Sequence, residues 1–197
     1  MTIEIIAFTL SLICVALNAY GHILTWPLMI ASSAAYAWVF QDAKLFGDAW
    51  LQGVFILLAI YAWKTWSKSA QAAKAAQTDS TQISSFKRMP RSWWLFGSFL
   101  WSGLFLVIHY VLENHTSSDV ALMDAFLTSG SLLATYMSAQ KWLENWLVWI
   151  FVNSLYIALY IYKDLHLTAL LYVLLIALAV LGWLQWSKKI KLGELTQ

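Results

Sequence analysis

Seven apolar stretches, each about as long as a bilayer core is thick, follow one another along this 197-residue chain. They cover approximately residues 3–20, 23–40, 49–66, 93–112, 119–139, 146–162 and 166–187, close to the roughly 17–25 residues that a membrane-spanning helix needs. The chain is 61% hydrophobic and only 11% charged, whereas about a quarter of the residues in soluble domains are charged. The sequence therefore predicts an all-α polytopic membrane protein with seven transmembrane helices.

The basic residues predict the orientation of this bundle. Of the 12 Lys and Arg residues, all but Lys44 and Lys163 flank connections on one side of the predicted membrane. By the positive-inside rule, the long 67–92 connection and the C-terminus are expected in the cytoplasm and the N-terminus outside. Basic runs that flank membrane spans indicate topology rather than nucleic-acid binding, so no nucleic-acid partner is expected.

The chain also resembles itself when it is shifted by 120 residues. Between residues 26 and 66, 11 of 41 positions are identical to their counterparts, and four of these pairs are aromatic: Trp26/Trp146, Tyr36/Tyr156, Trp63/Trp183 and Trp66/Trp186. This register predicts two parallel three-helix repeats joined by a linker helix, a 3+1+3 arrangement. The expected units are 1–66 for the first repeat, 67–118 for the cytoplasmic loop and linker helix, 119–187 for the second repeat and 188–197 for a cytoplasmic tail.

The sixth span carries four aromatic or polar residues on one helical face. Trp146, Trp149, Asn153 and Tyr156 are three, four and three residues apart, so their side chains point the same way. An amide near the bilayer centre is costly unless it finds a partner or faces a water-filled cavity. We expect this face to line a pocket for a flat, polar ligand, although interfacial packing is the simpler role for Trp146.

Two further polar residues are candidates for the same pocket. Gln52 lies one turn into the third span, and Thr135 lies in the fifth, where a hydrogen bond to its own helix is an equally good interpretation. Comparison of the repeats ranks the candidates. Trp146 and Tyr156 have aromatic counterparts and are better suited to the fold, whereas Trp149 and Asn153 pair with Met29 and Ser33 and are better suited to a ligand.

The main alternative class is a membrane-embedded enzyme, and the sequence argues against it. The four His residues lie near predicted membrane edges, and neither a His-Glu-x-x-His nor a Gly-x-Ser-x-Gly pattern occurs. The single cysteine, Cys14, supports no disulfide and no metal site. We expect no catalytic residues, no metal and no cofactor. The proposed pocket also lacks a carboxylate or a His, and the chain has no nucleotide-binding loop, so passive uniport is expected.

The pattern Trp146-x-x-Trp149-x-x-x-Asn153 resembles the motif of the PnuC family of vitamin transporters. Further stretches are similar to that family, and the resemblance extends over nearly the whole chain apart from the 67–92 loop. These stretches are Lys141–Trp146, Leu159–Lys163, Leu170–Tyr172, Trp26-Pro27, Tyr36-Ala37, Lys44–Asp48 and Leu51-Gln52.

The resemblance implies a fold and a function. The fold is a 3+1+3 architecture like that of SWEET sugar transporters, in a homotrimer in the bacterial cytoplasmic (inner) membrane. The function is import of nicotinamide riboside by facilitated diffusion, followed by trapping through a cytoplasmic kinase. Trp146 and Trp149 would contact the cationic ring, Asn153 would bind the carboxamide or a ribose hydroxyl, and Tyr156 or Gln52 would contact the remainder.

One residue departs from the family pattern and leaves the cargo open. Many family members have Gln where this chain has Thr135. Thiamine is also a planar cation, so a transporter of thiamine or another planar vitamin is the alternative. A vitamin sensor, or a subunit of a larger transport complex, is the alternative of another class.

Overall fold

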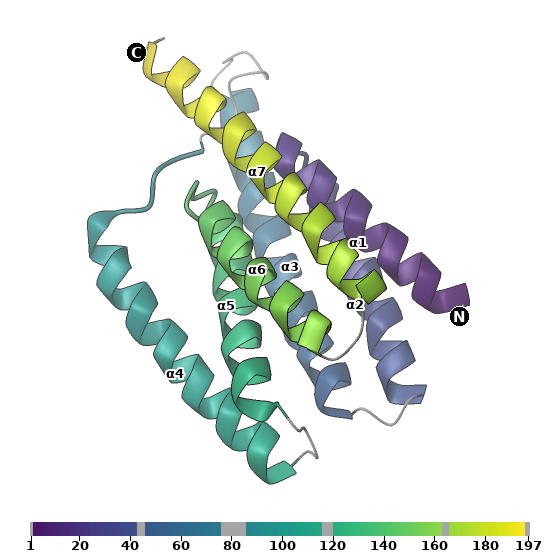
Figure 1. Ribbon diagram of the computed structural model, residues 1–197. Coiled ribbons are helices and arrows are strands. Elements are labelled where there is room, and N and C mark those ends of the chain that lie inside the picture. The colour runs from purple at the N-terminus through teal and green to yellow at the C-terminus, as the bar shows by residue number, and fades with distance from the viewer. Residues whose placement is uncertain (1, 43–45, 76–85, 116–119, 163–165, 196–197) are drawn as a thin grey trace.

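The computed structural model describes residues 2–42, 46–75, 86–115, 120–162 and 166–195. Each of the seven predicted spans forms an α-helix, so the predicted all-helical architecture is confirmed (Figure 1). The helices are α1 (Thr2–Tyr20), α2 (Thr25–Asp42), α3 (Phe46–Ala75), α4 (Arg91–His115), α5 (Ala121–Ala139), α6 (Asn145–Tyr162) and α7 (His166–Leu195).

Six of these helices close into a ring, and α4 lies outside it. In the ring, α1 contacts α2, α2 contacts α3, α3 contacts α5, α5 contacts α6, α6 contacts α7, and α7 returns to α1. The fourth helix packs along α5 at the edge of the bundle (Figure 1). Each of these contacts made by α1, α2 and α3 has its counterpart among α5, α6 and α7. The helix arrangement therefore follows the 120-residue repeat, with α4 as the linker.

Two helices continue past the ends that hydropathy predicts. The third extends to Ala75 rather than to residue 66, and the seventh to Leu195 rather than to residue 187. Residues 67–75 are rich in Ala, Lys, Gln and Ser. Ala, Lys and Gln are strong helix formers, so the chain stays helical after it becomes too polar for hydrocarbon. Helix α3 therefore continues beyond residue 66, where the sequence becomes polar and the loop was predicted to begin.

The helices differ in how apolar they are. Within the described residues, α4, α6 and Ala169–Gly193 of α7 are long and apolar enough to cross a membrane by length and composition, and Ile6–Tyr20 is a shorter apolar helix. The fifth helix carries four buried polar residues, Ser129, Ser131, Thr135 and Ser138. Such a helix loses mean hydropathy because its polar residues face the bundle interior rather than lipid.

The first turn of each repeat is built in the same way down to its hydrogen bonds. After α1, the N–H of Gly21 donates to the carbonyl of Asn18 (2.9 Å), and that of His22 to Leu17 (2.9 Å). The bonds after α5, each 120 residues later, are Lys141 to Ser138 (3.0 Å) and Trp142 to Met137 (3.1 Å). This pair of bonds is the Schellman motif, which places one residue in the left-handed region. Gly21 has φ 73°, and Lys141 adopts the same conformation at φ 58°.

The core of the bundle is made from repeat counterparts. Trp26 packs edge-on against Trp66 with ring centroids 5.3 Å apart, and Trp146 packs edge-on against Trp186 at the same 5.3 Å. All four rings are buried. Small residues surround them as matched pairs, namely Ala19/Ala139 and Ala59/Ala179. Packing between helices of the same repeat therefore explains why the tryptophans occupy matching positions in the two repeats.

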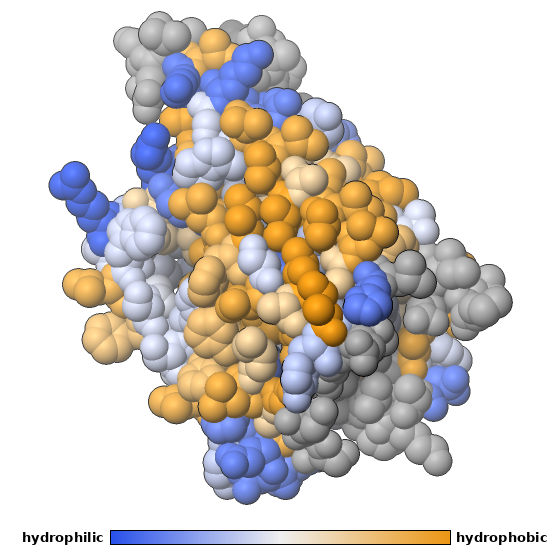
Figure 2. All heavy atoms as spheres, in the orientation of Figure 1, coloured by the Kyte–Doolittle hydropathy of each residue, from blue (hydrophilic) through white to orange (hydrophobic). Residues whose placement is uncertain are grey.

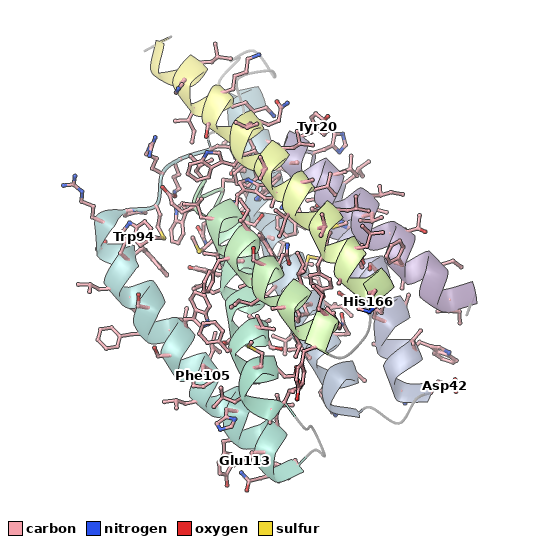
Figure 3. All side chains as sticks on the ribbon, viewed as in Figure 1. Tyr20, Asp42, Trp94, Phe105, Glu113 and His166 are labelled. Atoms are coloured by element: carbon pink, nitrogen blue, oxygen red, sulfur yellow. The ribbon has the colours of Figure 1, made fainter. Side chains whose placement is uncertain are left out.

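The surface has the polarity expected of a membrane protein. Figure 2 shows a broad hydrophobic belt across this face, with hydrophilic residues gathered toward the two ends. Tyr20 and Trp94 lie toward the end from which the C-terminus of α7 projects, and Asp42 and Glu113 lie at the other end (Figure 3). We call the former the basic end, because it carries Arg88, Arg91, Lys141 and the last turns of α7.

Candidate functional site

A cavity of about 250 Å³ lies inside the ring of helices, and every ring helix contributes to its wall. Helices α1, α2 and α3 supply the larger share of it. The described residues that line it are Ser11, Cys14, Val15, Asn18, Thr25, Trp26, Met29, Ser32, Ser33, Tyr36, Gln52, Phe55, Thr135, Ser138, Trp146, Trp149, Asn153, Leu175 and Ala179.

The cavity surrounds the pseudo-twofold axis of the two repeats. Six pairs of repeat counterparts line it together: Val15/Thr135, Asn18/Ser138, Trp26/Trp146, Met29/Trp149, Ser33/Asn153 and Phe55/Leu175. In most of these pairs the two side chains differ in polarity or size. A symmetric backbone therefore encloses an asymmetric chemical environment, which suits a ligand whose two ends differ.

The sixth helix contributes Trp146, Trp149 and Asn153 to the wall. Asn153 is only 4% exposed, and its side-chain amide makes no hydrogen bond within the described part of the chain. An amide buried in this way needs a partner. In the cavity, that partner can be a ligand. Trp149 is half-buried on the same wall, one turn away from Asn153.

Gln52 and Thr135 also lie on the cavity wall. Thr135 donates its hydroxyl proton to the carbonyl of Ser131 on its own helix (2.8 Å), which is one of the two interpretations that the sequence offered. Its oxygen keeps lone pairs that can accept a hydrogen bond from a ligand. A Gln at position 135, as in many family members, could also donate a hydrogen bond. Thr and Gln therefore offer a ligand different hydrogen bonds at this position of the wall.

Tyr156, the remaining candidate, lies outside the set of residues that line the cavity. Its ring packs with Tyr160 (centroids 5.9 Å apart) and Tyr172 (4.7 Å), and its phenol lies at Ser131 and Thr128 of α5. Tyr36, its repeat counterpart, does line the cavity. Residues three or four positions apart share a helical face only approximately, because a helical turn is not a whole number of residues. Tyr156, at the end of the predicted face, therefore points toward α5 and α7 instead of the cavity.

The sequence did not single out Asn18 and Ser138, although the structure places them on the cavity wall. The amide of Asn18 donates to the hydroxyl of Ser138 (2.9 Å), and this hydroxyl lies 3.3 Å from the Asn18 Oδ1. Because these residues are repeat counterparts, their mutual contact marks the pseudo-twofold axis. A search of the repeat for aligned polar residues, rather than for identities, could have found them.

Two indole N–H groups at the cavity have no partner. The Nε1 atoms of Trp26 and Trp146 are buried and make no hydrogen bond within the described residues. By contrast, Trp66 donates to the carbonyl of Ala139 and Trp186 to that of Asn18, both at 3.1 Å. A buried donor without a partner is costly. Because neither Nε1 atom has accessible surface, these two donors are enclosed by protein rather than presented to a ligand.

The described lining contains no Asp, Glu, His, Lys or Arg. Within the part of the chain that the structure describes, no three His, Cys, Asp or Glu side chains group as metal ligands. What the site offers is aromatic faces together with amide and hydroxyl groups. Groups of this kind can bind a small, flat molecule by stacking and hydrogen bonds.

Comparison with known proteins places this arrangement in context. The family model described as "Nicotinamide mononucleotide transporter" matches residues 1–188. The nicotinamide riboside transporter PnuC of Neisseria mucosa is 24% identical, over 94% of this chain and 72% of the relative. PnuC of Escherichia coli K12 is 22% identical, over 93% of this chain and 84% of the relative.

A relative with a different stated cargo is similar to the same extent. The riboflavin/roseoflavin transporter RibM of Streptomyces davaonensis is 22% identical, over 93% of this chain and 83% of the relative. Among solved structures, the crystal structure of the vitamin B3 transporter PnuC superposes with a TM-score of 0.75 at 23% identity. The superposition covers 96% of this chain and 82% of that structure.

Proposed function

This chain belongs to the nicotinamide mononucleotide transporter family, in which the PnuC proteins are found, and is thus a multi-pass membrane transporter rather than an enzyme; we propose that it imports nicotinamide riboside by facilitated diffusion. The observation that carries this proposal is that Trp149 and Asn153 lie one turn apart on the wall of the cavity, and that the Asn153 amide has no hydrogen-bond partner among the described residues.

The chemistry of that pair fits the two ends of nicotinamide riboside. The pyridinium ring is flat and cationic, and an indole face attracts a desolvated cation by about 2 kcal/mol or more. Asn153 both donates and accepts, so it can pair with the carboxamide or with a ribose hydroxyl. Gln52 and Asn18 would contact the remaining polar groups.

The size of the cavity supports a small vitamin. About 250 Å³ lies just below the roughly 300–1,000 Å³ of typical ligand pockets. Nicotinamide riboside and thiamine each have two small rings, whereas riboflavin carries a fused three-ring system and a sugar chain. Riboflavin, named for one relative, is therefore the least favoured cargo, and thiamine is the closest competitor.

Passive transport is supported by the absence of charge. A proton-coupled carrier needs a group that titrates at or near its binding site, and the described lining offers no carboxylate or His. Net uptake would then depend on removal of the product, as the resemblance to PnuC transporters implies through a cytoplasmic kinase. A homotrimer is implied by the same resemblance.

The membrane and the orientation are part of the proposal. We place the chain in the bacterial inner membrane with the basic end in the cytoplasm, because cytoplasmic loops carry an excess of Lys and Arg. Lys87, Arg88, Arg91 and Lys141 all lie at that end. The N-terminus of α1 then lies outside.

A titration of the purified protein with nicotinamide riboside, thiamine and riboflavin tests the cargo. We expect saturable binding of nicotinamide riboside and weaker binding of the other two. Preference for thiamine or riboflavin would overturn this assignment. Uptake into proteoliposomes that contain only this chain tests the alternatives of a sensor or a subunit. Either of these would bind the vitamin but would not transport it alone.

A further inference from the structure

Phe86 is an aromatic residue that lies between the two repeats at the basic end. It belongs to the connection between α3 and α4 and therefore to neither repeat. Its ring stacks on Trp186 with centroids 4.1 Å apart and an interplanar angle of 24°, and it meets Trp66 edge-on at 6.2 Å. Trp66 and Trp186 are repeat counterparts, so one phenyl ring contacts both halves of the bundle.

The contacts continue from Phe86 to the cavity. Trp66 packs against Trp26, and Trp186 packs against Trp146, and both inner indoles line the cavity. The five rings belong to one hydrophobic cluster, and each is 6% exposed or less. Close-packed rings leave no path for water or a polar solute. These three layers of rings lie between the cavity and the basic end.

Phe86 is held to the two halves in different ways. The next residue, Lys87, exchanges backbone hydrogen bonds of 3.0 Å with Lys141 and Leu143, and the N–H of Met89 donates to Glu144 Oε2 (2.7 Å). All these partners belong to the turn between α5 and α6, in the second half. Hydrogen bonds therefore fix the 86–89 segment to the second half.

Toward the first half, the segment is held by contacts of the ring. Phe86 meets Trp66 edge-on and lies so close to Gly21 that an added Cβ there would be 2.5 Å from the ring. Ring contacts can part without leaving a polar group unsatisfied, whereas the bonds to the second half cannot. The junction between Phe86 and the first half is therefore where this segment can separate.

We propose that Phe86 is the gating residue at the basic end of the cavity, and that solute passes to that side only when its ring parts from Trp66. The consequence for transport rests on the proposed function. The closure itself does not, because it concerns access to the cavity whatever the cargo is.

The native cysteine allows a direct measurement of this access. Cys14 is the single cysteine of the chain and lines the cavity. A small, permanently charged methanethiosulfonate cannot cross the bilayer, so it modifies Cys14 only through an open path. The reagent is added to either face of vesicles, and a Cys14→Ser variant gives the background. A Cys14→Ser/Arg88→Cys variant identifies the face that carries the basic end.

We expect Phe86→Ala to speed modification of Cys14 from the basic end by roughly tenfold, since losing an aromatic contact shifts an open–closed equilibrium by about that factor. The rate from the opposite face should stay unchanged. Phe86→Leu, which keeps more bulk, should give a smaller increase. The matched control is Phe99→Ala, because Phe99 is 77% exposed on α4, and it should leave both rates unchanged.

Each outcome bears on the gate. An unchanged rate from the basic end in a monodisperse Phe86→Ala protein would overturn the proposal, as would an equal increase from both faces, which indicates general loosening. If Phe86→Ala does not fold, Phe86→Leu decides by the same criterion. Titration with nicotinamide riboside separates the two proposals. Faster labelling of Cys14 without binding of the vitamin would support the gate and reject the proposed cargo. Binding of the vitamin without faster labelling would support the cargo and reject the gate.

Discussion

At the scale of single residues, Asn153 has a buried amide that faces the cavity with no protein partner among the described residues. Replacing it with Leu should leave folding intact, because no hydrogen bond to the protein is lost. Affinity for nicotinamide riboside should fall by roughly 1–3 kcal/mol, the cost of leaving a ligand group unpaired. Isothermal titration measures the change in Kd.

The neighbouring Ser154 gives a matched control. It is exposed and donates to the carbonyl of Ile150 on its own helix (2.7 Å), so Ser154→Ala should not alter Kd. If Asn153→Leu bound the vitamin as tightly as the Ser154 variant, Asn153 would not be a ligand contact.

Trp149 allows the stacking hypothesis to be tested by graded truncation. Trp149→Phe keeps a ring face and should weaken binding modestly, whereas Trp149→Ala should weaken it about tenfold further, because the cation–aromatic attraction is lost. Kd values for both variants are compared with that of Trp50→Ala, a control on α3 that is 81% exposed. Equal losses for Phe and Ala would argue against stacking.

At the scale of elements, the approach of α7 to α6 depends on the small size of Gly182. A Cβ at this position would lie 2.4 Å from the indole of Trp146. Gly182→Ala should destabilise the protein by roughly 1–3 kcal/mol, as overpacking does in well-packed cores. Thermal unfolding in detergent, followed by the loss of monodisperse protein, measures this effect.

The third helix supplies the control. A Cβ on Gly53 would meet nothing within 4 Å, so Gly53→Ala should be neutral or stabilise by up to about 1 kcal/mol through helix propensity. Similar melting temperatures for the two variants would mean that Trp146 can shift without cost, and that its packing on Trp186 is not what fixes α7.

The connection between α3 and α4 shows how an element outside the repeats can depend on them. Phe86 stacks on Trp186, and the residues after it bond to the turn between α5 and α6. Such a contact lies beyond any local periodicity. Because Phe86 lies between the two halves, the short segment that carries it contacts both of them.

At the scale of the whole molecule, two matched three-helix units enclose one cavity without a charged lining residue among those described. Proteoliposomes should therefore fill with nicotinamide riboside only to the external concentration, and an imposed proton gradient should change neither the rate nor the end point. Radiolabelled uptake with and without a proton ionophore measures both. Accumulation above the external level that the ionophore abolishes would contradict uniport.

Much of the architecture could be predicted from sequence, because it depends on local patterns. Hydropathy alone located seven helices, and the 120-residue register located the matched tryptophans that pack as Trp26/Trp66 and Trp146/Trp186. Helical spacing brought Trp146, Trp149 and Asn153 to one wall. Their role in binding stays a prediction, as do those of Gln52 and Thr135.

The remainder was decided by tertiary structure. The contact of Asn18 with Ser138 joins residues 120 positions apart, the ring of Phe86 contacts both Trp66 and Trp186, and Tyr156 packs among tyrosines away from the cavity. Sequence fixes which side of a helix a residue occupies, since that follows from 3.6 residues per turn. What this side faces depends on how the helices pack, and packing is settled only when all of them are assembled around the common axis.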